Sequence, residues 1–291
     1  MAQVDQIVIY KTQISTLCAP GMGKTNSCLE SIECILGGSD TYIFIYPYQV
    51  SLRILGRHYC GGSIISERHI LTAAHCINEY TQPPFNYVSV VTGTTYLDKP
   101  GNVHRISKID VHPGWKVDKI IEDLPYPHDL AVITLKEKIV FNDCQQKIAL
   151  PSHNFEDDDE VTVTGWGITA QDPEVNPKQL QMLTTKLMAR DKCQKKMSNP
   201  EKIKISDSQV CAFRSDNKSP CFGDSGSPLA TEEELIGVFS WIDGDHCALG
   251  IPDIYTNVYE HKGYIQNILN NSNVLENHGY KPTVSHTLHE S

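Results

Sequence analysis

The sequence has no apolar stretch long enough to cross a membrane. None of its hydrophobic runs approaches the roughly 18 to 20 residues that a membrane-spanning helix needs. Positive charge is also scarce, because 25 Lys and Arg stand against 35 Asp and Glu, for a net charge of −10. This balance favours solubility and argues against nucleic acid or an anionic membrane as the main partner.

Metal-binding motifs are missing as well. The 12 histidines are scattered, and no Cys-x-x-Cys or His-Glu-x-x-His spacing occurs. The segment 92–103 contains Asp98 as its only acid, which is poor for calcium because calcium takes several oxygen ligands. We therefore expect no metal site and no cofactor.

The segment 221–228 is the most informative part of the chain, and it reads Cys-x-Gly-Asp-Ser-Gly-x-Pro. A serine hydroxyl attacks an amide only with a neighbouring base and with donors aimed at the developing oxyanion. Glycines let the backbone turn sharply, so the N–H groups of Gly223 and Ser225 can point at one spot. Ser225 is thus a candidate nucleophile beside a candidate oxyanion hole. Gly/Ser/Asp loops are also common in β proteins, so a base must be found elsewhere.

His75 is the candidate base. It follows an apolar, β-rich run, and an imidazole titrates near neutrality, so it can take the serine proton and return it to the leaving amine. Cys60 and Cys76 suggest a disulfide-closed loop that holds His75 in place. Asp129 opens another apolar run, and with His75 and Ser225 it becomes the candidate carboxylate that fixes the imidazole tautomer.

The order of these three motifs resembles the trypsin/chymotrypsin family of serine endopeptidases. The resemblance covers roughly residues 35 to 270 and extends to Ile-Leu-Gly-Gly, Gly-Trp-Gly, Ser-Trp and Tyr-Thr-Asn-Val, at positions 35–38, 165–167, 240–241 and 255–258. It implies a secreted, monomeric enzyme that hydrolyses peptide bonds through an acyl-enzyme intermediate. Its partners would be protein or peptide substrates and protein protease inhibitors.

The fold class follows from short β-rich runs separated by turn signals, which are typical of sandwiches and barrels. The resemblance narrows this all-β class to two packed six-stranded antiparallel β-barrels, with a boundary at about 145–160 and a C-terminal helix. The predicted protease domain is 35–270, and 271–291 is predicted to be a polar disordered tail. Helices are predicted near 190–197 and 260–269.

Ten cysteines indicate an oxidising environment. The resemblance pairs six of them, Cys60 with Cys76, Cys193 with Cys211, and Cys221 with Cys247. The remaining four are Cys18, Cys28, Cys34 and Cys144. Propeptide cysteines tether to the catalytic domain in chymotrypsin-like zymogens, and Cys144 is a candidate anchor for such a bridge.

Activation in this family depends on a cleavage before the Ile-x-Gly-Gly segment, whose new ammonium pairs with the Asp that precedes the nucleophile. The resemblance makes Ile35 and Asp224 that pair. Because an unpartnered buried charge is costly, this ion pair would act as an activation switch. However, Cys34 precedes Ile35, and the nearest upstream basic residue is Lys24. The N-terminus also lacks a secretory apolar core of about 7–15 residues. We interpret 1–34 as a propeptide-like or wrongly assembled segment; an unusual variant with different activation, or none, is the alternative.

Four residues form the predicted specificity pocket. The resemblance places Ser219 at its base, where trypsin-like enzymes carry Asp and chymotrypsin-like ones commonly carry Ser, and Ser240 on its wall. Ile242 replaces a usual glycine and should narrow the entrance, as in elastase-like pockets. Asp253 replaces another glycine, and because an unpaired buried carboxylate is costly it would accept a Lys or Arg side chain. The alternative is that Asp253 points away from the pocket or is satisfied by Ser219 and water. We favour chymotrypsin-like or mixed preference, then basic preference, then elastase-like preference.

Two classes of function remain. The complete set His75, Asp129 and Ser225 favours an active serine endopeptidase. The missing activation site favours a catalytically silent homologue or an unactivated zymogen that acts as a binding protein.

Overall fold

The computed structural model of the chain describes residues 38–116, 126–171, 174–175, 177–215, 218–244 and 246–277. The chain divides into units Met1–Glu33 and Cys34–Ser291, and every described residue lies in the second. Within the described residues, no helix is both long and apolar enough to span a bilayer.

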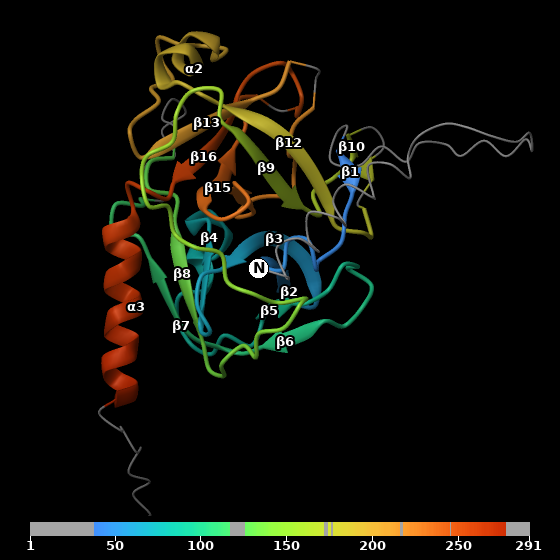
Figure 1. Cartoon of the computed structure of the whole chain (residues 1–291), viewed down its shortest axis with the longest axis vertical. Helices are drawn as coiled ribbons and strands as arrows, with labels where there is room; N and C mark the ends of the chain where they lie inside the picture. Colours follow the sequence, from blue (N-terminus) through green and yellow to red (C-terminus); the bar gives the residue numbers. More distant parts are fainter. Residues whose placement is uncertain are drawn as a thin grey trace, which may run out of the picture. The chain divides into compact units, whose positions relative to one another are not determined.

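The first sheet is antiparallel, in the order β6-β5-β2-β3-β4-β8-β7 (Figure 1). Its strands are β2 (Gln49–Ile54), β3 (Arg57–Ile64), β4 (His69–Thr72), β5 (Val88–Thr92), β6 (Asn102–His104), β7 (Ile106–Val111) and β8 (Ala131–Leu135). Only Arg105 separates β6 from β7, although these strands stand at opposite ends of the pairing order. One stretch of chain therefore borders both β5 and β8, and the sheet curls back on itself.

The second sheet closes completely. Its strands are β1 (Ser39–Asp40), β9 (Glu160–Gly165), β12 (Gln181–Met188), β13 (Gln209–Phe213), β14 (Pro228–Ala230), β15 (Leu235–Trp241) and β16 (Asp253–Asn257). Because β12 pairs with both β13 and β9, β12-β13-β16-β15-β14-β9 forms a ring of six, and β1 adds to β12. Buried and more exposed residues alternate along β12, as a strand with one face on a core requires.

These two sheets confirm the predicted all-β fold class of two antiparallel barrels. The ring of six is the second barrel, and the curled first sheet is the less completely closed one. Two further short strands, β10 (Ala170–Gln171) and β11 (Glu174–Val175), pair with each other. The chain passes from the first sheet to the second between β8 and β9.

Each sheet surrounds an apolar core, since its inward-facing positions are branched aliphatic or aromatic. The first core includes Val50, Leu52, Ile64, Ile70 and Ile133. The second includes Val163, Leu183, Val210, Leu229 and Tyr255. Burying one such side chain contributes roughly 1.5–3 kcal/mol, so these cores supply much of the free energy that holds the strands in register.

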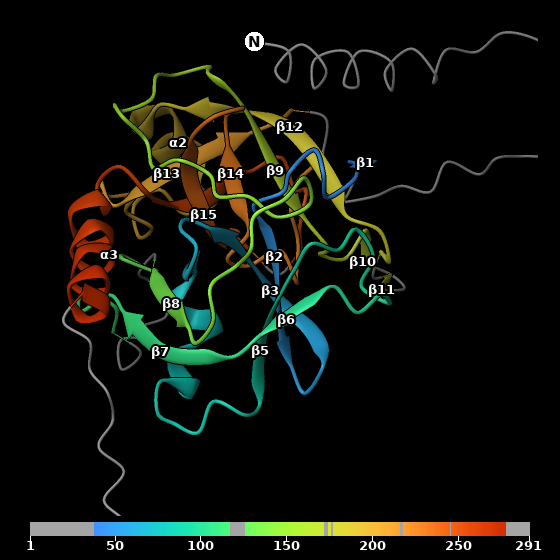
Figure 2. The same ribbon diagram turned by 60° about the horizontal axis from the view of Figure 1, so that its bottom comes forward.

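The predicted helices are present as α2 (Arg190–Lys196) and α3 (Lys262–Asn277), but α3 is longer than expected. It lies beside β7 and β8 in both views (Figure 1, Figure 2). Ile265 is fully buried in the first core, and the hydroxyl of Ser272 lies 3.0 Å from Nε2 of His69, which fastens the next turns to β4. These contacts correct the expected start of the disordered tail, because helix replaces it through Asn277; residues 278–291 lie outside the described part.

Three disulfides join the cysteine pairs that the family resemblance implies: Cys60–Cys76, Cys193–Cys211 and Cys221–Cys247. Each bridge stabilises the fold by roughly 2–4 kcal/mol, mainly by restricting the unfolded chain. Cys144 has no disulfide partner among the described residues. The proposed partners of Cys144 lie in the segment before Ile35, outside those residues.

Candidate active site

His75 and Asp129 meet at the edge of the first barrel. His75 lies in a short 3-10 helix, Ala74–Cys76, directly after β4, and Asp129 lies just before the paired strand β8. Nδ1 of His75 is 2.7 Å from Oδ2 of Asp129, and the backbone N–H of His75 donates to Oδ1 at 2.9 Å. Because a carboxylate only accepts, Nδ1 carries the imidazole proton and Nε2 keeps its lone pair.

Asp129 is fully buried, and the second barrel also holds it. The hydroxyl of Ser240 donates to Oδ2 at 2.6 Å, and the hydroxyl of Thr256 donates to the main-chain oxygen at 2.8 Å. Burial acts to lower the pKa of His75, but the charge and the hydrogen bond of Asp129 outweigh it, so the pKa is raised above 6.5. Sequence reasoning assigned Ser240 to the pocket wall and missed its bond to Asp129.

The nucleophile loop, residues 221–228 around the candidate Ser225, includes two amide N–H groups without an acceptor among the described residues. Gly223 and Gly226 adopt φ values of +96° and +78°, which only glycine reaches without strain. The N–H groups of Asp224, Gly226 and Ser227 donate to carbonyl oxygens of the protein. Among the described residues, the N–H groups of Gly223 and Ser225 find no acceptor, and neither does the Ser225 hydroxyl. Within the described part of the chain, these two N–H groups are therefore candidate donors to an anion.

Strand β3 and the end of β4 support this loop through close backbone contacts. Gly61 donates its N–H to the carbonyl oxygen of Ser225 at 2.7 Å. A Cβ on Gly226 would lie 2.3 Å from Oγ1 of Thr72 and 2.6 Å from the oxygen of Gly61. The glycine at position 226 is therefore needed for the two barrels to approach each other beside Ser225.

His58 is a support that the sequence did not reveal. Its Nε2 lies 3.0 Å from the carbonyl oxygen of Gly223, and its Nδ1 lies 2.9 Å from the hydroxyl of Ser51. A carbonyl only accepts, so Nε2 donates and Nδ1 accepts from the serine. Burial lowers the pKa of His58 to about 4, and the bond to Gly223 offsets only part of this effect. The neutral ring holds the Gly223 peptide in its orientation.

Asp224 is buried beneath the loop, and its carboxylate is bonded to backbone donors. Oδ1 accepts from Gly167 N–H at 2.7 Å and Oδ2 from Cys221 N–H at 3.0 Å. Burial nevertheless raises the pKa of Asp224 to about 6, against 3.8 for a free side chain. Ile35, the expected ammonium partner, lies outside the described residues.

One cleft of about 450 Å³ brings several of the predicted residues together. His75, Ser225, Ser240 and Ile242 line it, together with the exposed ring of Phe222. The nucleophile and base candidates therefore share one solvent-accessible space.

Ser219 and Asp253 lie together but are not among the residues that line this cleft. Both are buried, and the hydroxyl of Ser219 donates to the carbonyl oxygen of Pro220 at 2.7 Å, accepts from Ala248 N–H at 3.1 Å and also contacts the carboxyl of Asp253. Burial raises the pKa of Asp253 well above its usual range, the bond from Ser219 opposes this, and the charge of Asp224 adds to it. Asp253 thus has a local partner in Ser219, one of the alternatives that the sequence left open.

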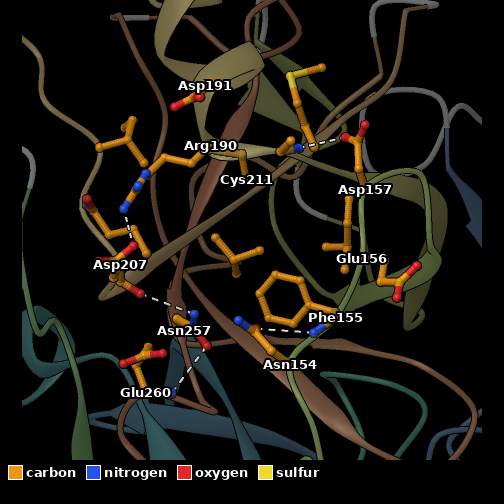
Figure 3. Close-up of a pocket in the computed structure, with 16 residues that line it drawn as sticks. Asn154, Phe155, Glu156, Asp157, Arg190, Asp191, Asp207, Cys211, Asn257 and Glu260 are labelled. Carbon is orange, nitrogen blue, oxygen red and sulfur yellow. Dashed lines mark hydrogen bonds and ion pairs between the residues drawn. The ribbon is translucent and has the colours of Figure 1, made fainter.

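A second hollow, of about 380 Å³, is rich in acidic residues but contains none of the three catalytic candidates (Figure 3). Asp157 accepts from the N–H of Ala189 at 2.7 Å, and Asp207 is paired with Arg190 (Figure 3). Because two of its acids are already paired within the protein, we assign this hollow no chemical role.

Three comparisons relate the chain to known proteins. The family model described as Trypsin matches residues 35–265. Chymotrypsin-2 of Vespa crabro is 34% identical over 233 residues, 80% of this chain and 98% of that protein. Trypsin alpha of Drosophila melanogaster is 32% identical over 255 residues, 87% of this chain and 94% of that protein. The solved structure of neuropsin, a serine protease expressed in the limbic system of mouse brain, matches with a TM-score of 0.72 and 27% identity, over 81% of this chain and all of that one.

Proposed function

Because the chain belongs to the trypsin family of serine endopeptidases, we propose that it cleaves peptide bonds with Ser225 as nucleophile, His75 as base and Asp129 as orienting carboxylate. The observation that carries the proposal is the 2.7 Å hydrogen bond between His75 Nδ1 and Asp129. It leaves Nε2 of His75 unprotonated in a residue that lines the same cleft as Ser225.

The reaction proceeds in two halves. Ser225 Oγ attacks the scissile carbonyl while its proton passes to Nε2 of His75, and the resulting oxyanion accepts from the N–H groups of Gly223 and Ser225. The C–N bond then breaks, the leaving amine takes the proton from His75, and an acyl-enzyme ester remains. Water attacks this ester with His75 again as base, which releases the acid and restores Ser225.

We assign the switch to Asp224 and the ammonium of Ile35. A buried carboxylate whose pKa is raised to about 6 is short of a positive partner, and a chain that begins at Ile35 supplies one. The protease domain proposed for this switch spans 35–270, close to the residues 35–265 that the family model matches. Bonds from Gly167 and Cys221 would remain in the paired state.

For substrate preference we propose a chymotrypsin-like or mixed pocket built on Ser219, Ser240, Ile242 and Asp253. Ser219 stands where a strict preference for Lys or Arg substrates would need a fixed negative charge. The neutral carboxyl of Asp253 loses its proton and becomes a carboxylate when a basic side chain enters the pocket. The curated relatives named as trypsin and as chymotrypsin have similar identities, 32% and 34%, so likeness alone favours neither preference. We also propose secretion, a monomeric state, and protein protease inhibitors as binding partners.

The proposal is tested with an active-site-directed fluorophosphonate, applied to the full chain and to a chain that begins at Ile35. We expect strong labelling of the shortened chain, weak labelling of the full chain, and none after Ser225→Ala. The matched control is Ser227→Ala, because Ser227 belongs to the same loop but is fully buried and does not line the cleft. Absence of labelling in a folded chain that begins at Ile35 contradicts the proposed enzyme. Equal labelling of both chains contradicts the Ile35–Asp224 switch.

A further inference from the structure

Three histidines that are far apart in the sequence meet directly beside Asp129. His112 follows β7, His128 immediately precedes Asp129, and His261 immediately precedes α3. One ring nitrogen from each lies within 4.8 Å of the others. We propose that these three imidazoles bind a divalent transition-metal ion, with zinc as the matching metal because imidazole nitrogen is one of its usual ligands.

His261 is already oriented as a metal ligand. Its Nδ1 lies 2.6 Å from the carbonyl oxygen of Asn257, so Nδ1 donates and Nε2 holds the lone pair. Donation of the second ring N–H to a backbone carbonyl is the usual way in which a protein orients a metal-bound histidine. Nδ1 of His128 lies 3.0 Å from this Nε2 and donates to it in the absence of metal. When the ion replaces that hydrogen bond, the proton of His128 moves from Nδ1 to Nε2.

His112 completes the set. Its ring stacks on that of His128, with centroids 4.8 Å apart and planes at 19°, and lies edge-on to that of His261 at 5.0 Å. Parallel rings cannot both direct lone pairs at one ion, so binding requires the His112 side chain to tilt away from the N–H of Gly114, which is 3.1 Å from its Nδ1. Three imidazoles then leave the fourth tetrahedral position to water.

Access and packing both favour an ion at this place. His112 and His128 are partly exposed, so an ion can reach them from solvent, whereas His261 is buried. Burial lowers the pKa of His112 and of His261, which keeps both rings neutral and able to bind metal at neutral pH. A Cβ on Gly114 would lie 2.7 Å from the ring of His128, so only glycine there permits this close grouping.

The site is coupled to Asp129 through the backbone. His128 has φ +57°, a conformation that non-glycine residues adopt rarely, and its peptide leads directly to Asp129. Two nitrogens that bind one tetrahedral zinc ion lie about 3.3 Å apart, whereas those of His128 and His261 are 3.0 Å apart in the hydrogen bond, so an ion moves His128 away from His261. This movement shifts the carboxylate of Asp129 that orients His75. On the proposed function, zinc binding lowers peptidase activity.

Isothermal titration calorimetry with Zn²⁺ tests the site without reference to activity. The full chain carrying His75→Ala is used as parent, so that the catalytic imidazole cannot bind the ion. We expect one ion per chain. His128→Asn, chosen because Asn tolerates positive φ, should weaken binding by more than the roughly 10–100-fold that follows from loss of an outer-shell partner.

The control is His153→Gln, because His153 is exposed and lies outside the cluster; it should bind zinc like the parent. His112→Gln is the second ligand variant, since its partly exposed ring can be replaced with little disturbance, and circular dichroism verifies that each variant folds. Absence of stoichiometric binding in the parent, or unchanged affinity in both ligand variants, overturns the site.

A second experiment measures inhibition by zinc in any preparation whose Ser225 reacts with the fluorophosphonate. We expect His128→Asn to abolish this inhibition. Binding without inhibition supports the site and overturns the coupling to Asp129. If Ser225 never labels, the proposed function fails, and calorimetry still decides whether the metal site exists.

Discussion

Ser240 and His75 share one carboxylate oxygen of Asp129. The Ser240 hydroxyl donates to Oδ2 at 2.6 Å, and His75 Nδ1 donates to the same atom at 2.7 Å. Ser240 lies on β15 of the second barrel, whereas His75 follows β4 of the first. The orientation of the imidazole thus depends on both barrels, and not only on the loop that carries it.

Ser240→Ala should reduce kcat/KM by roughly tenfold or more. A hydrogen bond to a charged group is worth about 1.5–3 kcal/mol, and about 1.4 kcal/mol corresponds to a factor of ten. The matched control is Thr256→Val, which removes a bond to the neutral carbonyl of Asp129 and should cost about 0.5–1.5 kcal/mol of stability with a smaller effect on rate. Peptide hydrolysis and thermal unfolding measure both. Equal losses in the two variants would contradict a specific role for Ser240.

Asp253→Asn should lower activity toward peptides with Lys or Arg at the cleavage position, relative to peptides with Tyr. The carboxylate is the acceptor that we propose for a basic side chain, and a charge-assisted bond of about 1.5–3 kcal/mol corresponds to a tenfold or larger change in the ratio. Asp243→Asn is the control, because Asp243 is also buried but bonds to Ser198 instead of Ser219. An unchanged Arg-to-Tyr ratio in Asp253→Asn would show that the carboxyl serves only to pair with Ser219.

Ile242→Gly should shift preference toward large aromatic side chains. Ile242 lines the cleft, and removing its branched side chain opens the entrance. A single methylene in an apolar pocket changes discrimination by about 1–3 kcal/mol, so the ratio of kcat/KM for Phe over Val peptides should rise at least tenfold. Ile242→Val keeps the branch and should leave the ratio nearly unchanged. If the ratio rises equally in both variants, the entrance is not what limits large side chains.

The candidate site was predictable from sequence where one local motif identifies one residue. His75, Asp129 and Ser225 each stand in such a motif, and the structure brings their elements together. The contacts that hold them were not predictable in this way, because they join positions far apart in the chain. The bond between His58 and Gly223 spans 165 positions, and its geometry depends on the register of β3 against the nucleophile loop.

The same limit explains the histidine cluster and the length of α3. No spacing rule links His128 to His261, which are 133 positions apart, so the absence of a metal motif could not exclude a metal site. In α3, the polar residues Asn270, Asn271 and Ser272 suggested a tail. Tertiary contacts decide otherwise, since Ile265 is anchored in the first core and Ser272 contacts a strand residue.

Asp224 should make the stability of the full chain fall as the pH rises from about 4 to about 6. Its pKa is raised from 3.8 to about 6 in the folded protein, so its contribution to the free energy of unfolding is greatest below pH 3.8 and is lost as the pH passes 6. The loss is about 3 kcal/mol, at roughly 1.4 kcal/mol for each pKa unit. Urea unfolding of wild type and Asp224→Asn across this range measures it, because Asn does not titrate and the difference between the two curves isolates Asp224.

Wild type and Asp224→Asn, both made to begin at Ile35, should show the opposite dependence of stability on pH. An ammonium beside Asp224 favours the carboxylate and brings its pKa below 3.8, so the stability difference between wild type and Asp224→Asn then grows as the pH rises through the acid range. Asn also cannot accept from both Gly167 and Cys221, but that cost is independent of pH and leaves the slope unaffected. Parallel curves for the two proteins in both chain forms would show that Asp224 has the same pKa folded and unfolded, and the proposed switch would lose its physical basis.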